Sequence, residues 1–119
     1  MKKCYETMFI VKPTLTGEEL ASKVELVKNT ITKQGGEISA TSDMGIRRLA
    51  YPIQKQNRGY YYVIYFQGEG NIIPELERIY KVTEDIIRTI VIKYEKKLEL
   101  KAWEDMVNKA KPKESNNVQ

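Results

Sequence analysis

The residues of this sequence best suited to binding a ligand are concentrated in one basic stretch. Between Asp43 and Glu69 the sequence has no acidic residue. It has four basic residues there: Arg47, Arg48, Lys55 and Arg58. The whole chain carries a net charge of +4, so these four account for it and the remaining charges sum to zero. This concentration predicts an anionic partner, because guanidinium groups bind phosphate oxygens with bidentate geometry.

A run of aromatic residues follows the last of these arginines. The segment Arg58-Gly59-Tyr60-Tyr61-Tyr62-Val63-Ile64-Tyr65 resembles the RNP1 motif of RNA-recognition domains, with departures at Tyr61 and Tyr62. In those domains the motif positions of Tyr60 and Tyr62 stack on bases. The strand phase argues against this use, because Tyr62, Ile64 and Phe66 form the more apolar series and should face the helices. Packing tyrosines are favoured, and a single-stranded RNA-binding domain that uses Tyr60 and Tyr62 is the alternative.

The sequence offers little for catalysis. It has no histidine and one cysteine, Cys4, so neither a disulfide within the chain nor a zinc site is expected. No P-loop or glycine-rich dinucleotide loop is present. We therefore expect no enzymatic activity, no cofactor and no metal. A small phosphate-processing enzyme is a third, less favoured hypothesis, because residues 12–16 lack the arginine and glycines of an anion-cradling loop.

The first half of the chain shows clear signals for three elements. Cys4–Lys12 alternates like a strand and ends at Pro13. Residues 16–19 form a capping box, and Leu20, Val24, Val27 and Ile31 follow at helical spacing until Gly35-Gly36. Glu37–Tyr51 reads as a polar strand, with a bulge at Gly45.

The second half repeats this order. Residues 52–59 are expected to form a turn with residues 54–58 exposed at its tip, and Tyr60–Gln67 is the clearest strand. Pro74 fits a first helical turn, followed by an apolar stripe of Ile73, Leu76, Ile79 and Tyr80, and Ile86–Tyr94 is the last strand.

This βαββαβ order predicts an α+β, ferredoxin-like sandwich, in which a four-stranded antiparallel sheet carries two helices on one face. We expect the first and third strands to be central and residues 1–95 to form the domain. Residues 96–119 should be a C-terminal extension that is partly helical, around Leu98–Val107, and then disordered. No signal-peptide core and no 18-residue apolar stretch is present, so a cytoplasmic location is expected.

The sheet face away from the helices is unusually apolar in this prediction. Seven residues should lie on it: Met8, Ile10, Tyr61, Val63, Tyr65, Ile90 and Ile92. A patch of this kind is seldom left in water. We expect it to be covered by a protein partner or by the C-terminal segment around Trp103, and the sequence does not decide between them.

One stretch resembles a known family. Gly45-Ile46-Arg47-Arg48-Leu49-Ala50-Tyr51-Pro52-Ile53-Gln54-Lys55, with Gly59-Tyr60, resembles the signature of the bacterial ribosomal protein S6 family. The early Tyr5-Glu6, Pro13 and the last strand with Arg88 fit it too, so the resemblance covers residues 1 to about 95. It implies a structural protein of the cytoplasmic ribosome, bound to small-subunit (16S) ribosomal RNA together with ribosomal protein S18, with no small-molecule substrate and no membrane. The apolar sheet face would suit the protein partner.

In that setting the basic residues become candidate RNA contacts. The set comprises Lys2, Lys3, Arg47, Arg48, Lys55, Arg58, Arg88 and Lys93. Contacts of this type position a protein on RNA and carry little sequence information. Because four clustered charges release few counterions, we expect RNA binding to be weak for the chain alone and stronger with its partner.

Overall fold

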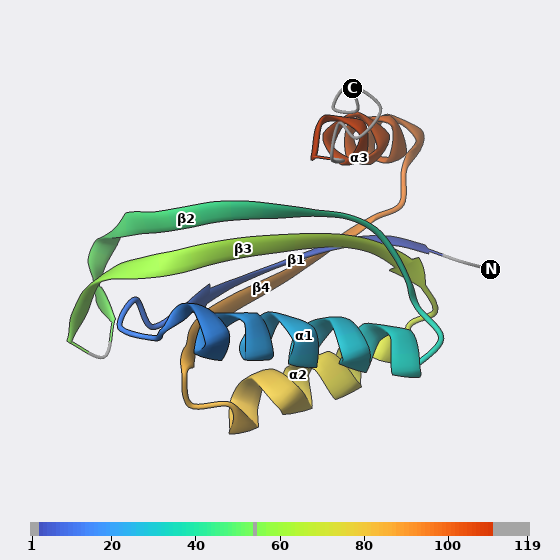
Figure 1. The fold of residues 1–119 in the computed structure, drawn as a ribbon. Coiled ribbons are helices and arrows are strands. Elements are labelled where there is room, and N and C mark those ends of the chain that lie inside the picture. The colour runs from blue at the N-terminus through green and yellow to red at the C-terminus, as the bar shows by residue number, and fades with distance from the viewer. Residues whose placement is uncertain (1–2, 54, 111–119) are drawn as a thin grey trace, which may run out of the picture.

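The computed structural model describes residues 3–53 and 55–110, and Figure 1 shows their arrangement. The elements are β1 (Lys3–Val11), α1 (Gly17–Lys33), β2 (Glu37–Ile53), β3 (Gln56–Gly68), α2 (Ile72–Val82), β4 (Ile86–Tyr94) and α3 (Lys97–Ala110). One sheet has the order β2-β3-β1-β4, and every neighbouring pair is antiparallel. The predicted ferredoxin-like fold is confirmed, with β1 and β3 in the centre.

Local signals place the ends of the first helix as expected. The Thr16 hydroxyl accepts a hydrogen bond from the Glu19 amide at 3.1 Å, and the Glu19 carboxylate accepts one from the Thr16 amide at 2.8 Å. This capping box satisfies two amides that an isolated helix start would leave unpaired. At the other end Gly35 adopts φ +89°, a left-handed conformation that glycine accepts without a Cβ clash.

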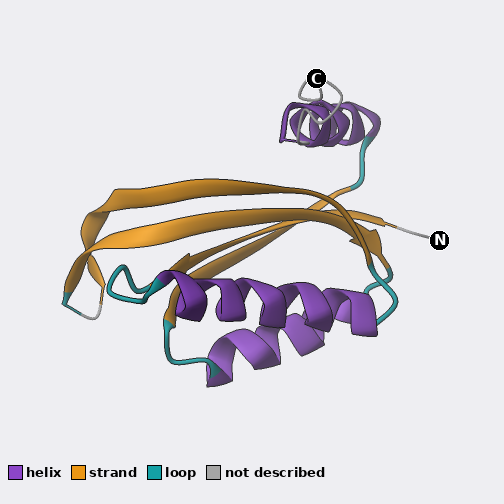
Figure 2. Cartoon of the chain, in the orientation of Figure 1, coloured by secondary structure: helices purple, strands orange, loops and turns teal. Residues whose placement is uncertain are grey.

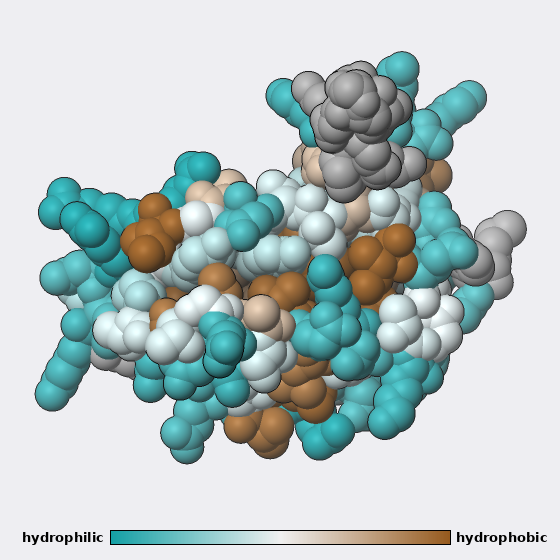
Figure 3. All heavy atoms as spheres, viewed as in Figure 1, coloured by the Kyte–Doolittle hydropathy of each residue, from teal (hydrophilic) through white to brown (hydrophobic). Residues whose placement is uncertain are grey.

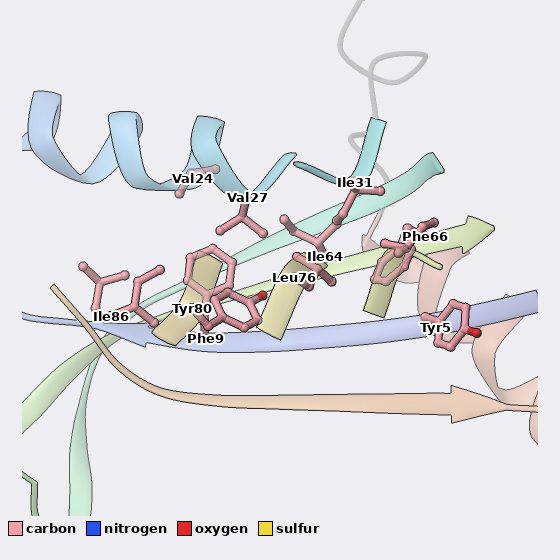
Figure 4. Packing of buried hydrophobic residues seen from close by; sticks show 12 residues of the cluster. Tyr5, Phe9, Val24, Val27, Ile31, Ile64, Phe66, Leu76, Tyr80 and Ile86 are labelled. Atoms are coloured by element: carbon pink, nitrogen blue, oxygen red, sulfur yellow. The ribbon is translucent and has the colours of Figure 1, made fainter. Parts of the chain in front are cut away.

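Helices α1 and α2 lie side by side on one face of the sheet, as Figure 2 shows. Between them and the sheet lies the main core, whose buried members come from β1, β3, both helices and the start of β4. Figure 4 shows this packing, with Phe9 beside Tyr80 and Ile64 below Val27 of α1. The Tyr80 hydroxyl lies 2.7 Å from the Thr7 hydroxyl inside the core. Each of these two buried polar groups therefore has a partner.

The hairpin between β2 and β3 is longer than the sequence suggested. The prediction of a turn over residues 52–59 is wrong in extent, because β2 continues to Ile53 and β3 begins at Gln56. The expected bulge at Gly45 is confirmed by a register shift and by its φ of +77°. Another register shift lies between Ile38 and Ala40, and a wider bulge follows Gly45: between the pairs Arg48↔Arg58 and Ile53↔Gln56, residues 49–52 face Asn57 alone. Pro52 is tolerated here because the bulge does not require its missing N–H.

Helix α3 lies on the opposite face of the sheet from α1 and α2 (Figure 1). Its Trp103 and Val107 are buried with Ala40, Val63 and Tyr65 in a second apolar cluster. The Trp103 indole donates a hydrogen bond to the Tyr5 carbonyl at 2.9 Å. The sheet is therefore packed on both faces near this end. The disorder expected from Lys111 onward lies outside the described residues.

Candidate functional site

The first candidate site is the end of the β2–β3 hairpin, residues 46–58, which we call the basic arm. Arg48 and Arg58 are directly opposite each other in the β2–β3 register, and Arg47 is opposite Gly59. Like charges directly opposite on neighbouring strands destabilise a sheet. Within the described residues, no basic side chain of the arm forms a salt bridge. The arm therefore carries positive charge that the described part of the protein does not neutralise.

The shape of the arm adds to its positive charge. Ile46, Arg47, Arg48 and Arg58 line a hollow of about 510 Å³. The Arg47 Nε donates to the Met44 carbonyl at 3.2 Å, which steadies the side chain and leaves its terminal nitrogens free of that contact. At the tip of the hairpin Lys55 has a left-handed backbone conformation, with φ +67°. In Figure 3 hydrophilic residues dominate the hairpin end of the molecule.

The tyrosines of the RNP1-like segment face the helices. The Tyr60 hydroxyl donates to both carboxylate oxygens of Asp43, at 2.6 and 2.7 Å, and this hydrogen bond raises the pKa of Tyr60 to about 12. The Tyr62 ring packs on Phe9 with 5.7 Å between centroids. Both tyrosines pack against the main core, as the strand phase predicted. They do not form a base-stacking platform on the helix-free face, so the alternative that depends on such a platform loses its basis.

The helix-free sheet face is partly covered by the chain itself. Of the seven residues predicted to face a partner, three are buried: Ile10 is 3% exposed, and Val63 and Tyr65 are 4% and 8% exposed because α3 packs over them. Burial also raises the pKa of the Tyr65 hydroxyl. By contrast Ile90 and Ile92 on β4 are 40% and 41% exposed. The face available to a partner is therefore smaller than expected and lies toward β4 and the arm.

A groove remains on this face, walled on one side by apolar residues of the basic arm. We call it the sheet-face groove; it has a volume of about 190 Å³ and is lined by Met8, Ile10, Leu49, Ala50, Tyr51, Ile53, Tyr61 and Arg88. Leu49 and Ile10 are buried at its base, close to Gly59. The wide bulge supplies the groove wall, since Leu49, Ala50 and Tyr51 belong to it.

The structure separates the predicted basic residues into groups. Arg88 comes from β4 and contacts an apolar part of the arm instead of the arginine cluster: it hydrogen-bonds to the Tyr51 hydroxyl, with its guanidinium carbon 5.6 Å from the ring centroid. Lys3 and Lys93 lie toward the other end of β1 and β4, since Lys93 pairs with Tyr5 and Arg88 with Ile10. The two positions are five residues apart along the strand, which corresponds to about 17 Å, so Lys93 is well separated from Arg88.

The second basic group differs from the arm in having an acidic neighbour. Lys93 forms a surface salt bridge with Glu95 at 2.5 Å, which raises the pKa of Lys93. Lys2 lies outside the described residues.

Sequence reasoning missed the wide bulge and the contact of Tyr51 with Arg88. In the sequence, the segment Leu49-Ala50-Tyr51-Pro52 stands out only as part of a family signature, and its residue pattern fits a strand running into a turn. Proline in a strand was the one available signal, because it marks edges and bulges.

Two further properties of the described residues bear on other functions. Residues 3–53 and 55–110 contain no cluster of three or more histidine, cysteine or acidic side chains able to hold a metal ion. None of the helices in these residues has the length and apolar character needed to cross a bilayer.

Comparisons with known proteins agree on one family. Residues 4–93 match the family model described as ribosomal protein S6. The small ribosomal subunit protein bS6 of Nitratiruptor sp. is 57% identical over 107 residues, which cover 90% of this chain and 84% of that protein. Its counterpart from Helicobacter pylori is 55% identical over 112 residues, covering 94% and 79%. A crystal structure of 30S ribosomal protein S6 from Thermotoga maritima superposes with a TM-score of 0.79 at 38% identity, covering 91% of this chain and 99% of that one.

Proposed function

The chain belongs to the ribosomal protein S6 family, and from that premise we propose that it binds 16S ribosomal RNA jointly with ribosomal protein S18. As a member of this family it is a structural protein of the small ribosomal subunit, located on the ribosome, and not an enzyme. The RNA and the protein partner are assigned to different side chains: the basic side chains of the arm for RNA, and the exposed part of the helix-free sheet face, including the apolar arm residues that wall its groove, for S18.

The observation that carries the RNA assignment is the unneutralised charge of the arm. Arg48 and Arg58 lie opposite each other without a described carboxylate partner, at a cost in stability that an external anion would remove. Phosphate oxygens fit this role, because arginine presents a planar fork of donors to them. Arg47, Arg48, Lys55 and Arg58 are therefore our principal RNA contacts. Lys3 and Lys93 form a second and weaker group, and Lys2, which lies outside the described residues, stays a candidate from the sequence alone.

The assignment of S18 rests on exposed apolar surface. Ile90 and Ile92 lie on the edge strand β4, next to Glu6 and Met8 of β1, and expose more of their surface than core residues do. Tyr61, on the same face, lies between this strip and the arm. An apolar strip rimmed by polar residues is typical of a protein–protein interface. The strip continues into the sheet-face groove, so one partner can contact both.

Joint binding follows from the small number of charges. When the logarithm of affinity for a duplex is plotted against the logarithm of salt concentration, each phosphate that the protein neutralises adds about −0.9 to the slope. Four arm contacts give a slope of roughly −3 to −4, too little for tight binding at physiological salt. We expect S18 to supply the remaining contacts.

The test is to measure binding to 16S ribosomal RNA at several salt concentrations for the chain, for S18 and for an equimolar mixture. The mixture should bind more tightly than either protein, and the chain alone weakly. Replacing Arg47, Arg48 and Arg58 by glutamine should lower the salt slope of the mixture by about 3. Tight binding of the chain alone in high salt, or an unchanged slope in the triple variant, would contradict the proposal.

A further inference from the structure

The sheet-face groove differs in chemistry from the rest of the surface. Its floor and walls are apolar, with Met8, Ile10, Leu49 and Ile53 among the lining side chains, and its volume is about 190 Å³. This is below the roughly 300–1,000 Å³ typical of small-molecule pockets. The space therefore suits one large side chain better than a free metabolite.

The single charged residue of the groove is Arg88. Its guanidinium hydrogen-bonds to the Tyr51 hydroxyl and lies near the Tyr51 ring, so its position is fixed by the wide bulge. No carboxylate of the described residues forms a salt bridge with it. An arginine held in place beside an apolar hollow, without an acidic neighbour, is suited to bind a carboxylate from outside.

We infer that the groove receives one large apolar side chain of the protein partner, with an acidic group of the same partner bound to Arg88. This deepens the proposed function, since it rests on the pairing with S18 and names the residue types that S18 should present. Buried aromatic or aliphatic anchors in a small pocket carry much of the energy of such interfaces. Arg88 is accordingly assigned to the protein partner and not to RNA.

A flipped nucleobase is the competing occupant, and the lining of the groove argues against it. Recognition of a base needs donors and acceptors for its edges, whereas most residues that line the groove are apolar. The groove also adjoins the exposed apolar strip of Ile90 and Ile92, which offers nothing to a polyanion. Protein contact is favoured on both counts.

The experiment titrates purified S18 into the full-length chain by calorimetry, with Arg88→Gln and Tyr61→Ala as test variants. Each should weaken S18 binding by at least about tenfold. Arg78→Gln is the matched control, because Arg78 is an exposed arginine on α2 that pairs with Glu75, and it should stay within about twofold of the parent chain. Raising the salt concentration from about 0.1 to 0.5 M should weaken S18 binding to the parent chain more than S18 binding to the Arg88→Gln variant.

The outcomes separate the groove from the proposed function. If S18 binds the parent chain but binds both variants equally well, the groove inference is wrong and the proposed pairing stands. If S18 does not bind the parent chain at all, the pairing itself fails. If Arg88→Gln keeps S18 binding and weakens binding of the chain to protein-free 16S ribosomal RNA, the groove holds a nucleotide instead. Thermal unfolding of each variant verifies the fold. If Tyr61→Ala proves unstable, S18 binding to Arg88→Gln alone tests the groove inference.

Discussion

The indole Nε1 of Trp103 donates a buried hydrogen bond to the main-chain carbonyl of Tyr5 at 2.9 Å, and this contact fastens α3 to the central strand β1. The two residues are 98 positions apart in the chain. Trp103 is 4% exposed and packs with Val107 over Val63 and Tyr65. The C-terminal helix is thus a fixed cover for one part of the sheet, and its docking determines how much apolar surface is left for a partner.

Replacing Trp103 by alanine should lower the free energy of unfolding by about 3–5 kcal/mol, because it removes a large buried side chain and leaves the Tyr5 carbonyl without its donor. Urea unfolding followed by circular dichroism measures this change. Leu98→Ala is the control: Leu98 is in the same helix but 82% exposed, and its loss should cost less than about 0.5 kcal/mol. Equal effects of the two changes would show that α3 is not docked as described.

Replacing Arg58 by glutamine should separate stability from RNA binding. The change removes one of two like charges facing each other across the arm, so stability should be unchanged or rise by about 0.2–1 kcal/mol. Affinity of the chain with S18 for 16S ribosomal RNA should fall, and its salt slope should decrease by about 1. Thermal unfolding and RNA titration on the same sample check both effects, with Lys81→Gln on α2 as the control for total charge. A destabilised variant would mean that Arg58 has a structural partner.

The Tyr60 hydroxyl should titrate near pH 12, well above an ordinary tyrosine, because ionisation would place its charge against the Asp43 carboxylate and break their hydrogen bond. The folded state binds this proton more tightly than the unfolded state does. The stabilising contribution is therefore complete below pH 10 and is lost as the pH rises from about 10 to 12.

Ultraviolet difference titration of the parent chain against Tyr60→Phe isolates this hydroxyl among the eight tyrosines. Asp43→Asn removes the neighbouring charge, so it should move the Tyr60 pKa back toward its usual range and flatten the loss of stability above about pH 10. A Tyr60 pKa that the Asp43→Asn substitution leaves unchanged would contradict the assigned cause.

Replacing Gly59 by alanine should destabilise the protein by about 1–3 kcal/mol, because a Cβ there would lie 2.2 Å from Cγ2 of Ile10 beneath the sheet-face groove. The strain should also displace Ile10 or the bulge and weaken S18 binding. Gly17→Ala serves as the control, since a Cβ at that helix position has nothing within 4 Å and should leave stability unchanged or slightly higher. Chemical denaturation and S18 titration test the pair; a fully stable Gly59→Ala variant would mean that Ile10 moves aside without cost.

The sequence by itself determined the elements and the phase of the sheet. Thr16 and Glu19 define the helix start through contacts three residues apart, and Tyr62, Ile64 and Phe66 identify the buried side of β3 through strict alternation. The acid-free span around Arg47, Arg48 and Arg58 was equally visible, because charge composition does not depend on folding. These features are local, and local physics encodes them directly.

Tertiary structure alone decided what covers the helix-free face and where Arg88 acts. Trp103 contacts Tyr5, and Arg88 contacts Tyr51, only because the fold brings together a helix and strands that are distant in sequence. The wide bulge at residues 49–52 depends on the register of β2 against β3, which the turn and the pairing of both strands set together. Such contacts depend on how the whole chain packs, so the periodicity of apolar residues along the sequence does not predict them.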